Sequence, residues 1–204
     1  IKYQAGFEGV SGTIDYSLFG SVSGTIKNLN VNADVTLGGT VDNMNVALIC
    51  GSLTSSGVIE YCNVSGNVNS TVDPTLGGSD AGLIVGESSG TVKYCTGSGN
   101  VVGVGYVGGL IGQTKGSASV LACYFTGSVK AVSPDGTPVL SLGLGSFAGG
   151  ICGYASSNTQ ISFCVADGTI TSGWVTSGIA SVIAGVSEGN ASVNYTYADG
   201  ELIV

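Results

Sequence analysis

A repeated segment dominates this sequence and limits the possible folds more than any other feature. Its clearest copy, residues 107–129, reads VGGLIGQTKGSASVLACYFTGSV, in which two short aliphatic runs flank a polar Gly/Ser turn and a third run follows a glycine. Related copies occupy residues 16–35, 46–68, 81–101, 148–170 and 180–202. A repeat of about 30 residues that continues without a break is typical of an elongated array in which each copy packs only on its neighbours.

Alignment of the copies places their apolar residues in columns. The first aliphatic column lies two residues before a turn glycine and contains Leu18, Ile49, Ile84, Leu110, Ile151 and Ile183. The second follows the polar turn and contains Ile26, Ile59, Val92, Val120, Ile161 and Val193. The third follows another glycine and contains Val35, Val68, Val101, Val129, Ile170 and Leu202. Columns this uniform indicate that each residue stacks on its counterpart in the next copy.

Short β-strands explain these columns better than helices do. The runs are rich in β-branched residues and are interrupted by glycines, each of which costs about 1 kcal/mol in a helix interior. We therefore predict an all-β fold, a single-stranded parallel β-solenoid (β-helix) of about six coils with three short strands each. The right-handed bias of parallel crossovers sets its expected hand. We expect one domain over residues 1–204, with glycines at the corners and residues 1–15 forming a cap-like opening turn.

The connections between copies differ in length, whereas the spacing within the conserved half is constant. The variable connections are residues 70–80, 102–106, 130–147 and 171–178. Because insertions are tolerated at the surface, we expect all four connections to project from one edge of the solenoid.

Charge and hydropathy exclude several classes of partner. The chain has only 5 basic residues, no histidine and a net charge of −8. Nucleic acids and anionic membranes require clustered Lys and Arg, so neither is an expected partner. No apolar run approaches the ~20 residues of a membrane span, so membrane insertion is not expected. The chain begins without Met, and we interpret it as a piece of a larger, exported polypeptide.

The six cysteines form two groups. Four share one column, Cys62, Cys95, Cys123 and Cys164, whereas Cys50 and Cys152 precede turn glycines. Zinc sites need close Cys pairs or histidines, so we predict neither a metal nor another cofactor. Buried free thiols that fill the core are the favoured interpretation. Bridges within a coil, Cys50–Cys62 and Cys152–Cys164, are the alternative.

Paired carboxylates are the other candidate for chemistry, because many parallel β-solenoids cleave polysaccharides with them. Asp167 and Asp199 share a column in the last two copies, but the earlier copies have Ser or Thr there. We interpret this column as a turn position and predict no catalytic residue.

A recognition edge is the remaining candidate site. Tyr106, Phe147 and Trp174 lie on or beside the variable connections, and Asp135 lies in the longest one. Aromatic rings at such an edge could stack on a sugar or anchor a protein partner. The alternative is that these rings cover the ends of exposed columns.

The repeats resemble those of a known family. The run Gly109-Leu110-Ile111-Gly112, followed by SVLACYFTGSV, is similar to GLUG-motif repeats, and the resemblance extends over residues 16–202. It departs from the pattern where Leu29 and Thr196 replace the cysteine and where Gly149-Gly150-Ile151-Cys152 replaces the core motif. Such repeats occur in bacterial surface adhesins and in non-catalytic regions of immunoglobulin A-cleaving metallopeptidases. The resemblance implies an exported scaffold and supplies no catalytic residue.

Together these features predict a non-catalytic segment of an extracellular or cell-surface bacterial protein. The segment would present or space an adhesive surface toward a host or matrix protein or a glycan. One alternative is a scaffold region attached to a hydrolase or peptidase outside this segment. A carbohydrate-active solenoid with its own acidic site is the other.

Overall fold

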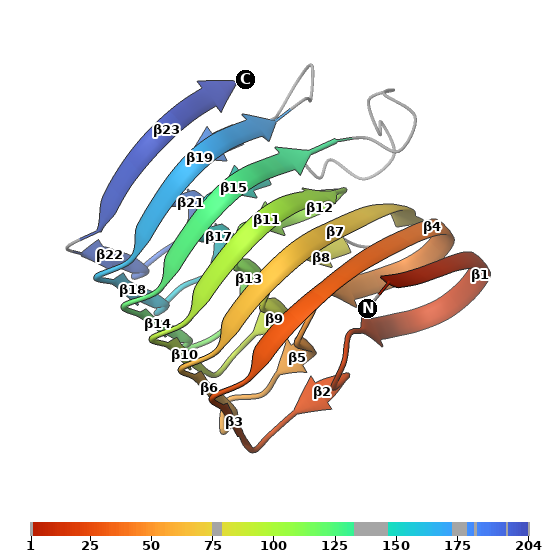
Figure 1. The fold of residues 1–204 in the computed structure, drawn as a ribbon, viewed down its shortest axis with the longest axis horizontal. Helices are drawn as coiled ribbons and strands as arrows, with labels where there is room; N and C mark the ends of the chain where they lie inside the picture. The colour runs from red at the N-terminus through yellow and green to blue at the C-terminus, as the bar shows by residue number, and fades with distance from the viewer. Residues whose placement is uncertain are drawn as a thin grey trace.

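The computed structural model describes residues 2–74, 79–132, 147–172, 179–181, 183–194 and 196–203. Within these ranges the chain forms strands and no helix, and every paired strand is parallel to its neighbour. Figure 1 shows the strands stacked side by side along one axis. This arrangement confirms the predicted parallel β-solenoid. No described segment forms a helix long and apolar enough to cross a membrane.

Three sheets make up the solenoid. Sheet B contains β2 (Ser21–Val22), β5 (Cys50–Leu53), β9 (Val85–Ser88), β13 (Ile111–Thr114), β17 (Cys152–Ala155) and β21 (Ala184–Ser187). Sheet C contains β3 (Thr25–Lys27), β6 (Val58–Glu60), β10 (Thr91–Lys93), β14 (Ser119–Leu121), β18 (Gln160–Ser162) and β22 (Ser192–Asn194). Six strands in each of these sheets match the expected six coils.

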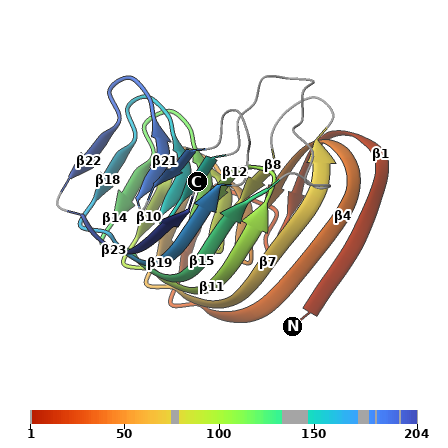
Figure 2. The same cartoon turned by 90° about the horizontal axis from the view of Figure 1, so that it is seen from above.

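Sheet A has 11 strands, because most coils cross it twice and β1 (Lys2–Tyr16) also pairs with β4. The first crossing uses β4 (Asn30–Val46), β7 (Asn63–Pro74), β11 (Thr96–Gly103), β15 (Tyr124–Ala131), β19 (Val165–Ser172) and β23 (Tyr197–Ile203). The second crossing uses the end of β4, then β8 (Ser79–Ala81), β12 (Gly105–Gly108), β16 (Phe147–Gly149) and β20 (Ile179–Ser181). Figure 2 shows β7, β11, β15 and β19 as one curved layer, separate from β10, β14, β18 and β22.

The strand register confirms the aliphatic columns. Val92 pairs with Ile59 on one side and with Val120 on the other, and Val101 likewise pairs with Val68 and Val129. Side chains of the inner coils are fully buried in these columns, whereas the terminal members Leu18, Val193 and Leu202 are exposed because they have a neighbouring coil on one side only. The core is therefore a set of continuous aliphatic ladders.

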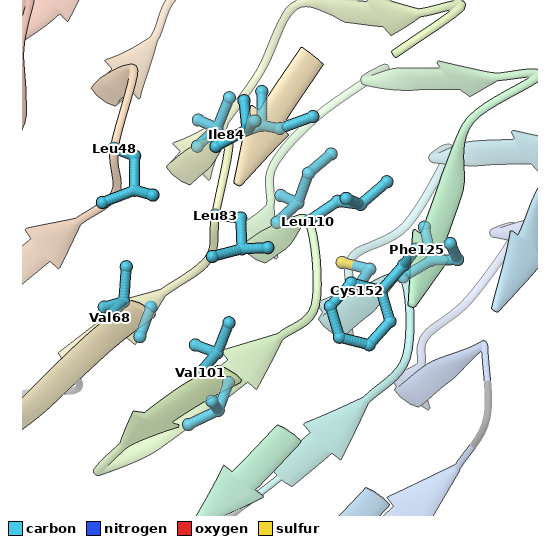
Figure 3. Close-up of a cluster of buried hydrophobic side chains, with 14 of the residues drawn as sticks. Leu48, Val68, Leu83, Ile84, Val101, Leu110, Phe125 and Cys152 are labelled. Atoms are coloured by element: carbon cyan, nitrogen blue, oxygen red, sulfur yellow. The ribbon is translucent and has the colours of Figure 1, made fainter. Parts of the chain in front are cut away.

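Large and small residues alternate between neighbouring columns inside the core. A Cβ on Gly109 would lie 2.6 Å from the ring of Phe125, and one on Gly97 would overlap Leu110 and approach Leu83. Figure 3 shows Phe125, Leu83 and Leu110 in this part of the core. The glycines thus leave the volume that these larger side chains occupy, which gives the close packing typical of protein interiors.

The ends of the predicted connections belong to sheet A. Residues 70–74 extend β7 and pair with β4, and residues 102–103, 130–131 and 171–172 extend the next three strands. Residues 75–78, 133–146 and 173–178 lie outside the described part of the chain. Residues 2–16 form the long strand β1 (Lys2–Tyr16), which pairs with β4, instead of the expected opening turn.

The residues with positive φ also differ from expectation. At the corner between sheets C and A, five residues that are not glycine have φ between 51° and 56°: Asn28, Tyr61, Tyr94, Ala122 and Phe163. The glycine column expected at a corner lies inside sheet A instead. Its member Gly99 has a φ of 148°, and a Cβ there would overlap the carbonyl oxygen of Gly66 in the preceding coil.

Candidate functional site

The second crossing of sheet A meets sheet B at a tight inward corner, and a column of glycines permits this close approach. A Cβ on Gly112 would lie 2.5 Å from the amide nitrogen of Ala81 and 2.7 Å from the carbonyl carbon of Asp80. Gly86 and Gly153 pack against the neighbouring strands in the same way. Because only glycine tolerates backbones this close, the turn glycine of the repeat sets the separation of the two sheets.

Two ladders of side chains run along this corner, one on each sheet. The sheet A ladder contains, in register, Asp15, Asn45, Asp80, Tyr106 and Phe147. The sheet B ladder contains Ser52, Glu87, Gln113 and Tyr154. The adjacent strand positions Val46, Ala81 and Val107 are fully buried in the core. Since successive side chains of a strand point to opposite faces, the ladder residues point away from the core and into the corner.

A pocket of about 270 Å³ lies in this corner, and we call it the corner pocket. It is lined by Thr13, Asn43, Asn45, Asp80, Glu87, Tyr106, Gln113 and Lys115. Every lining side chain has at least one hydrogen-bonding group. Pockets for drug-sized ligands usually occupy about 300–1,000 Å³. The corner pocket therefore suits one small polar or charged group of a larger ligand.

At the β1 end of the corner, the polar side chains satisfy one another. Ser52 Oγ donates a hydrogen bond to Asp15 Oδ1 at 2.6 Å. Asn45 Nδ2 donates to the same oxygen at 3.0 Å and to Ser52 Oγ at 2.9 Å. Because the Asp15 carboxylate already accepts two hydrogen bonds, these three residues hold the sheets together at this end of the corner.

Asp80, on the next rung, lacks comparable partners. The residue is only 5% exposed and lines the pocket, yet no described residue donates a hydrogen bond to its carboxyl group. Burial raises the pKa of Asp80 well above its ordinary value, and the neighbouring Glu87 carboxylate raises it further, whereas Lys115 lowers it. Glu87 forms an ion pair with Lys115 at 2.5 Å. The pocket thus contains one acid that resists ionisation beside another that has a counter-ion.

Tyr106, Phe147 and Tyr154 continue the two ladders and form what we call the aromatic cluster. The Tyr106 ring centroid lies 5.4 Å from that of Phe147 and 4.7 Å from that of Tyr154, and all three residues are partly exposed. Burial, followed by the carboxylates of Asp80 and Glu188, raises the pKa of Tyr106. Burial and Glu188 also raise the pKa of Tyr154. Both hydroxyl groups therefore remain protonated and can donate hydrogen bonds.

The structure brings together two of the four residues predicted for the recognition edge. Tyr106 and Phe147 lie on paired strands and stack on each other. Asp135 and Trp174 lie outside the described residues. Sequence reasoning missed Asp80 and Tyr154. The signal for both was available, because the spacing to the turn glycine is constant. Asp80 lies six residues before Gly86, and Tyr154 directly follows Gly153.

The cysteines are buried and free, all six of them, as the favoured interpretation predicted. Their thiols donate to backbone carbonyls, as Cys95 Sγ does to Lys93 O at 3.2 Å. The alternative bridges Cys50–Cys62 and Cys152–Cys164 are not formed.

The predicted column of Asp167 and Asp199 is also present, since the two residues pair in register. Both are exposed and lie within β19 and β23, not at a turn as expected. Within the described ranges, no group of three Cys, Asp or Glu residues is arranged to hold a metal ion.

Comparisons with known proteins do not assign this chain to a family. No family model, no curated protein and no solved structure matches it. The resemblance to GLUG-motif repeats therefore stays an expectation based on the sequence, and the corner pocket and aromatic cluster are the basis for proposing a function.

Proposed function

We propose that this chain is a non-catalytic segment of an extracellular or cell-surface bacterial protein that adheres to a glycan. The observation that supports this proposal is the convergence of the aromatic cluster and the corner pocket on two rigid sheets. A sugar ring has an apolar C–H face that packs on aromatic rings, and its hydroxyl groups need hydrogen-bonding partners. Tyr106 supplies both kinds of contact, because it belongs to the cluster and lines the pocket.

The solenoid gives this surface a second useful property. The ladder side chains project from paired strands, so their spacing is fixed by the hydrogen-bonded register of the coils. Parallel strands repeat at ~4.8 Å, and a ligand that extends along the axis would meet an ordered series of side chains. A surface that is ordered before binding loses little conformational entropy when a ligand attaches.

Binding of the purified chain to a panel of immobilised glycans tests the proposal. Tyr106→Ala and Tyr154→Ala should each weaken binding to the recognised glycan at least tenfold, about 1.4 kcal/mol. Tyr61→Ala is the matched control, because Tyr61 is an exposed, stacked tyrosine at a different corner of the solenoid. Binding that survives both cluster substitutions, or that Tyr61→Ala weakens equally, would refute a role for the aromatic cluster.

The carboxyl pair in the pocket favours a second candidate, cleavage of a glycan. Glycoside hydrolases use one protonated acid and one ionised carboxylate on opposite sides of the scissile bond. Asp80 resists ionisation, and Glu87 is its ion-paired neighbour. We prefer adhesion because Lys115 already engages the Glu87 carboxylate. Release of new reducing ends from the bound glycan, abolished by Asp80→Asn, would establish cleavage instead.

A further inference from the structure

We propose that the corner pocket binds the ammonium group of an amino-sugar polymer, with the Asp80 carboxylate as the counter-ion of that group. This inference rests on the proposed function, because it assumes that the corner binds a glycan, and it specifies which chemical class of glycan. The argument depends on charge balance, on the side chains around Asp80 and on the size of the pocket.

The cation that lines the pocket is already paired with another residue. Lys115 is its one cationic lining residue, and its ammonium group is paired with Glu87. Asp80 is only 5% exposed, and no described side chain donates a hydrogen bond to its carboxyl group. Lys115 favours the ionised form of Asp80, but its ammonium group is paired with Glu87. A buried carboxyl group without a partner is costly, and a bound cation would remove that cost. The pocket therefore has no described cation left to pair with Asp80 once that group is ionised.

The surroundings of Asp80 suit an ammonium group in particular. Tyr106 occupies the adjacent rung and lines the same pocket, and aromatic rings attract cations that lie over their faces. The side-chain oxygens of Asn45 and Gln113 are further acceptors in the lining. An ammonium group has three hydrogen-bond donors and no acceptor, which matches a wall composed of a carboxylate, amide oxygens and a ring.

An amino sugar fits this corner better than a lysine side chain. A sugar unit seated in the pocket places its neighbouring units along the corner, where the aromatic cluster provides ring faces. A lysine side chain would reach the pocket through a flexible apolar stem and would leave the rings of Phe147 and Tyr154 without a matching flat surface. The volume of about 270 Å³ suits one charged substituent and part of its sugar ring.

Binding should be coupled to release of a proton. Burial raises the pKa of Asp80, whereas an ammonium group beside it favours the ionised carboxylate, so binding should lower this pKa, release a proton to solvent and leave an ion pair. The titratable groups that face Asp80 are Glu87 on β9, Lys115 after β13, Tyr106 on β12 and Cys152 on β17. Asp15 on β1 lies one rung further, beyond Asn45.

A matched pair of ligands tests the inference: an oligomer of glucosamine and the same oligomer fully N-acetylated. Calorimetry at slightly acidic pH, where the amine is charged, should give at least about tenfold tighter binding of the amine form. Repeating the titration in buffers of different ionisation enthalpy measures the released proton. Asp80→Asn should remove both the preference and the proton release. Asp167→Asn removes an equal charge from an exposed position on β19 and should leave both unchanged.

Equal affinity for the two oligomers would overturn this inference while leaving glycan adhesion intact. Loss of the preference in Asp167→Asn as well would show that net charge, not the pocket, selects the amine. If Asp80→Asn does not fold, Glu87→Gln serves instead, because it also removes a carboxylate of the pocket and should reduce the preference. If a lysine-rich peptide binds in an Asp80-dependent way and neither oligomer binds, the partner of the pocket is a protein and not a glycan. Failure of every glycan in the earlier panel would refute the adhesion proposal itself.

Discussion

Substitution of Gly99 by alanine should expose how closely adjacent coils pack. Gly99 lies within β11 with a φ of 148°, and an added Cβ would overlap the carbonyl oxygen of Gly66 in the preceding coil. Two costs follow. The backbone conformation itself costs an L-residue about 1–3 kcal/mol. Moving the Gly66 carbonyl away from the methyl group would break or bend a ladder hydrogen bond, at about 1–3 kcal/mol.

Gly116 provides a control for positive φ without a close neighbour, although its left-handed backbone costs an L-residue less than that of Gly99. It has a φ of 61°, and an added Cβ would meet nothing within 4 Å. The difference between Gly99→Ala and Gly116→Ala therefore measures the close approach of the coils together with the less favourable φ of Gly99. For a chain of this size, about 1–3 kcal/mol corresponds to a melting temperature roughly 2–12 °C lower.

Thermal unfolding followed by circular dichroism measures this difference. We expect both variants to melt below the wild type and Gly99→Ala to melt clearly below Gly116→Ala. Equal melting temperatures for the two variants would refute the reasoning, because the neighbouring coil would then accommodate a methyl group without loss.

Three further predictions test other parts of the structure. Ile151→Asp should abolish the thermal transition, because Ile151 is fully buried between Leu110 and Ile183. Ile151→Val should lower the free energy of unfolding by only about 0.5–1.5 kcal/mol. A native-like thermal transition in the Asp variant would refute the column assignment. Burial raises the pKa of Cys50 and of Cys152 to about 12, so a thiol reagent at mildly alkaline pH should modify neither until denaturant is added, as mass spectrometry would show. Because the pKa of Asp80 is raised in the folded state, its contribution to stability is greatest below the ordinary pKa of about 3.9 and declines as the pH rises toward the folded pKa. The melting temperature of Asp80→Asn should therefore increase relative to that of the wild type as the pH rises. A difference in melting temperature that does not change with pH would contradict this.

The aliphatic columns were predictable because the repeat itself encodes them. Ile59, Val92 and Val120 occupy equivalent places in their copies, and the structure pairs them in register. A residue that recurs at one position in every coil must be stacked on its counterparts, and apolar residues that stack form the core. The cysteine column followed from the same reasoning.

The corner pocket was not predictable in this way, because the columns that line it are not chemically uniform. The position six residues before the turn glycine is occupied by a different residue type in each inner copy, so no shared chemistry marks it: Asn45, Asp80, Tyr106 and Phe147. The place of Asp80 in a ladder depends on β8 pairing with β4 and β12, which is a tertiary property. The prediction that glycines supply the positive φ at the corners also failed. Tyr61 and Tyr94 adopt φ values of 53° and 55° despite the steric cost to bulky residues, and nothing in the structure explains why.

The number of residues between paired positions of successive coils is not constant, and this has a consequence for how such a chain can diversify. Tyr124 pairs with Thr96, 28 positions earlier, and with Val165, 41 positions later, so one coil closes a loop 13 residues longer than the other. The entropy of loop closure grows only with the logarithm of length, and the longer loop costs about 0.3 kcal/mol more. That is less than the ~0.8 kcal/mol contributed by one buried methylene group. Segments inserted between the two crossings of sheet A therefore leave the stability of the array almost unchanged, and their sequences are free to vary beside the corner.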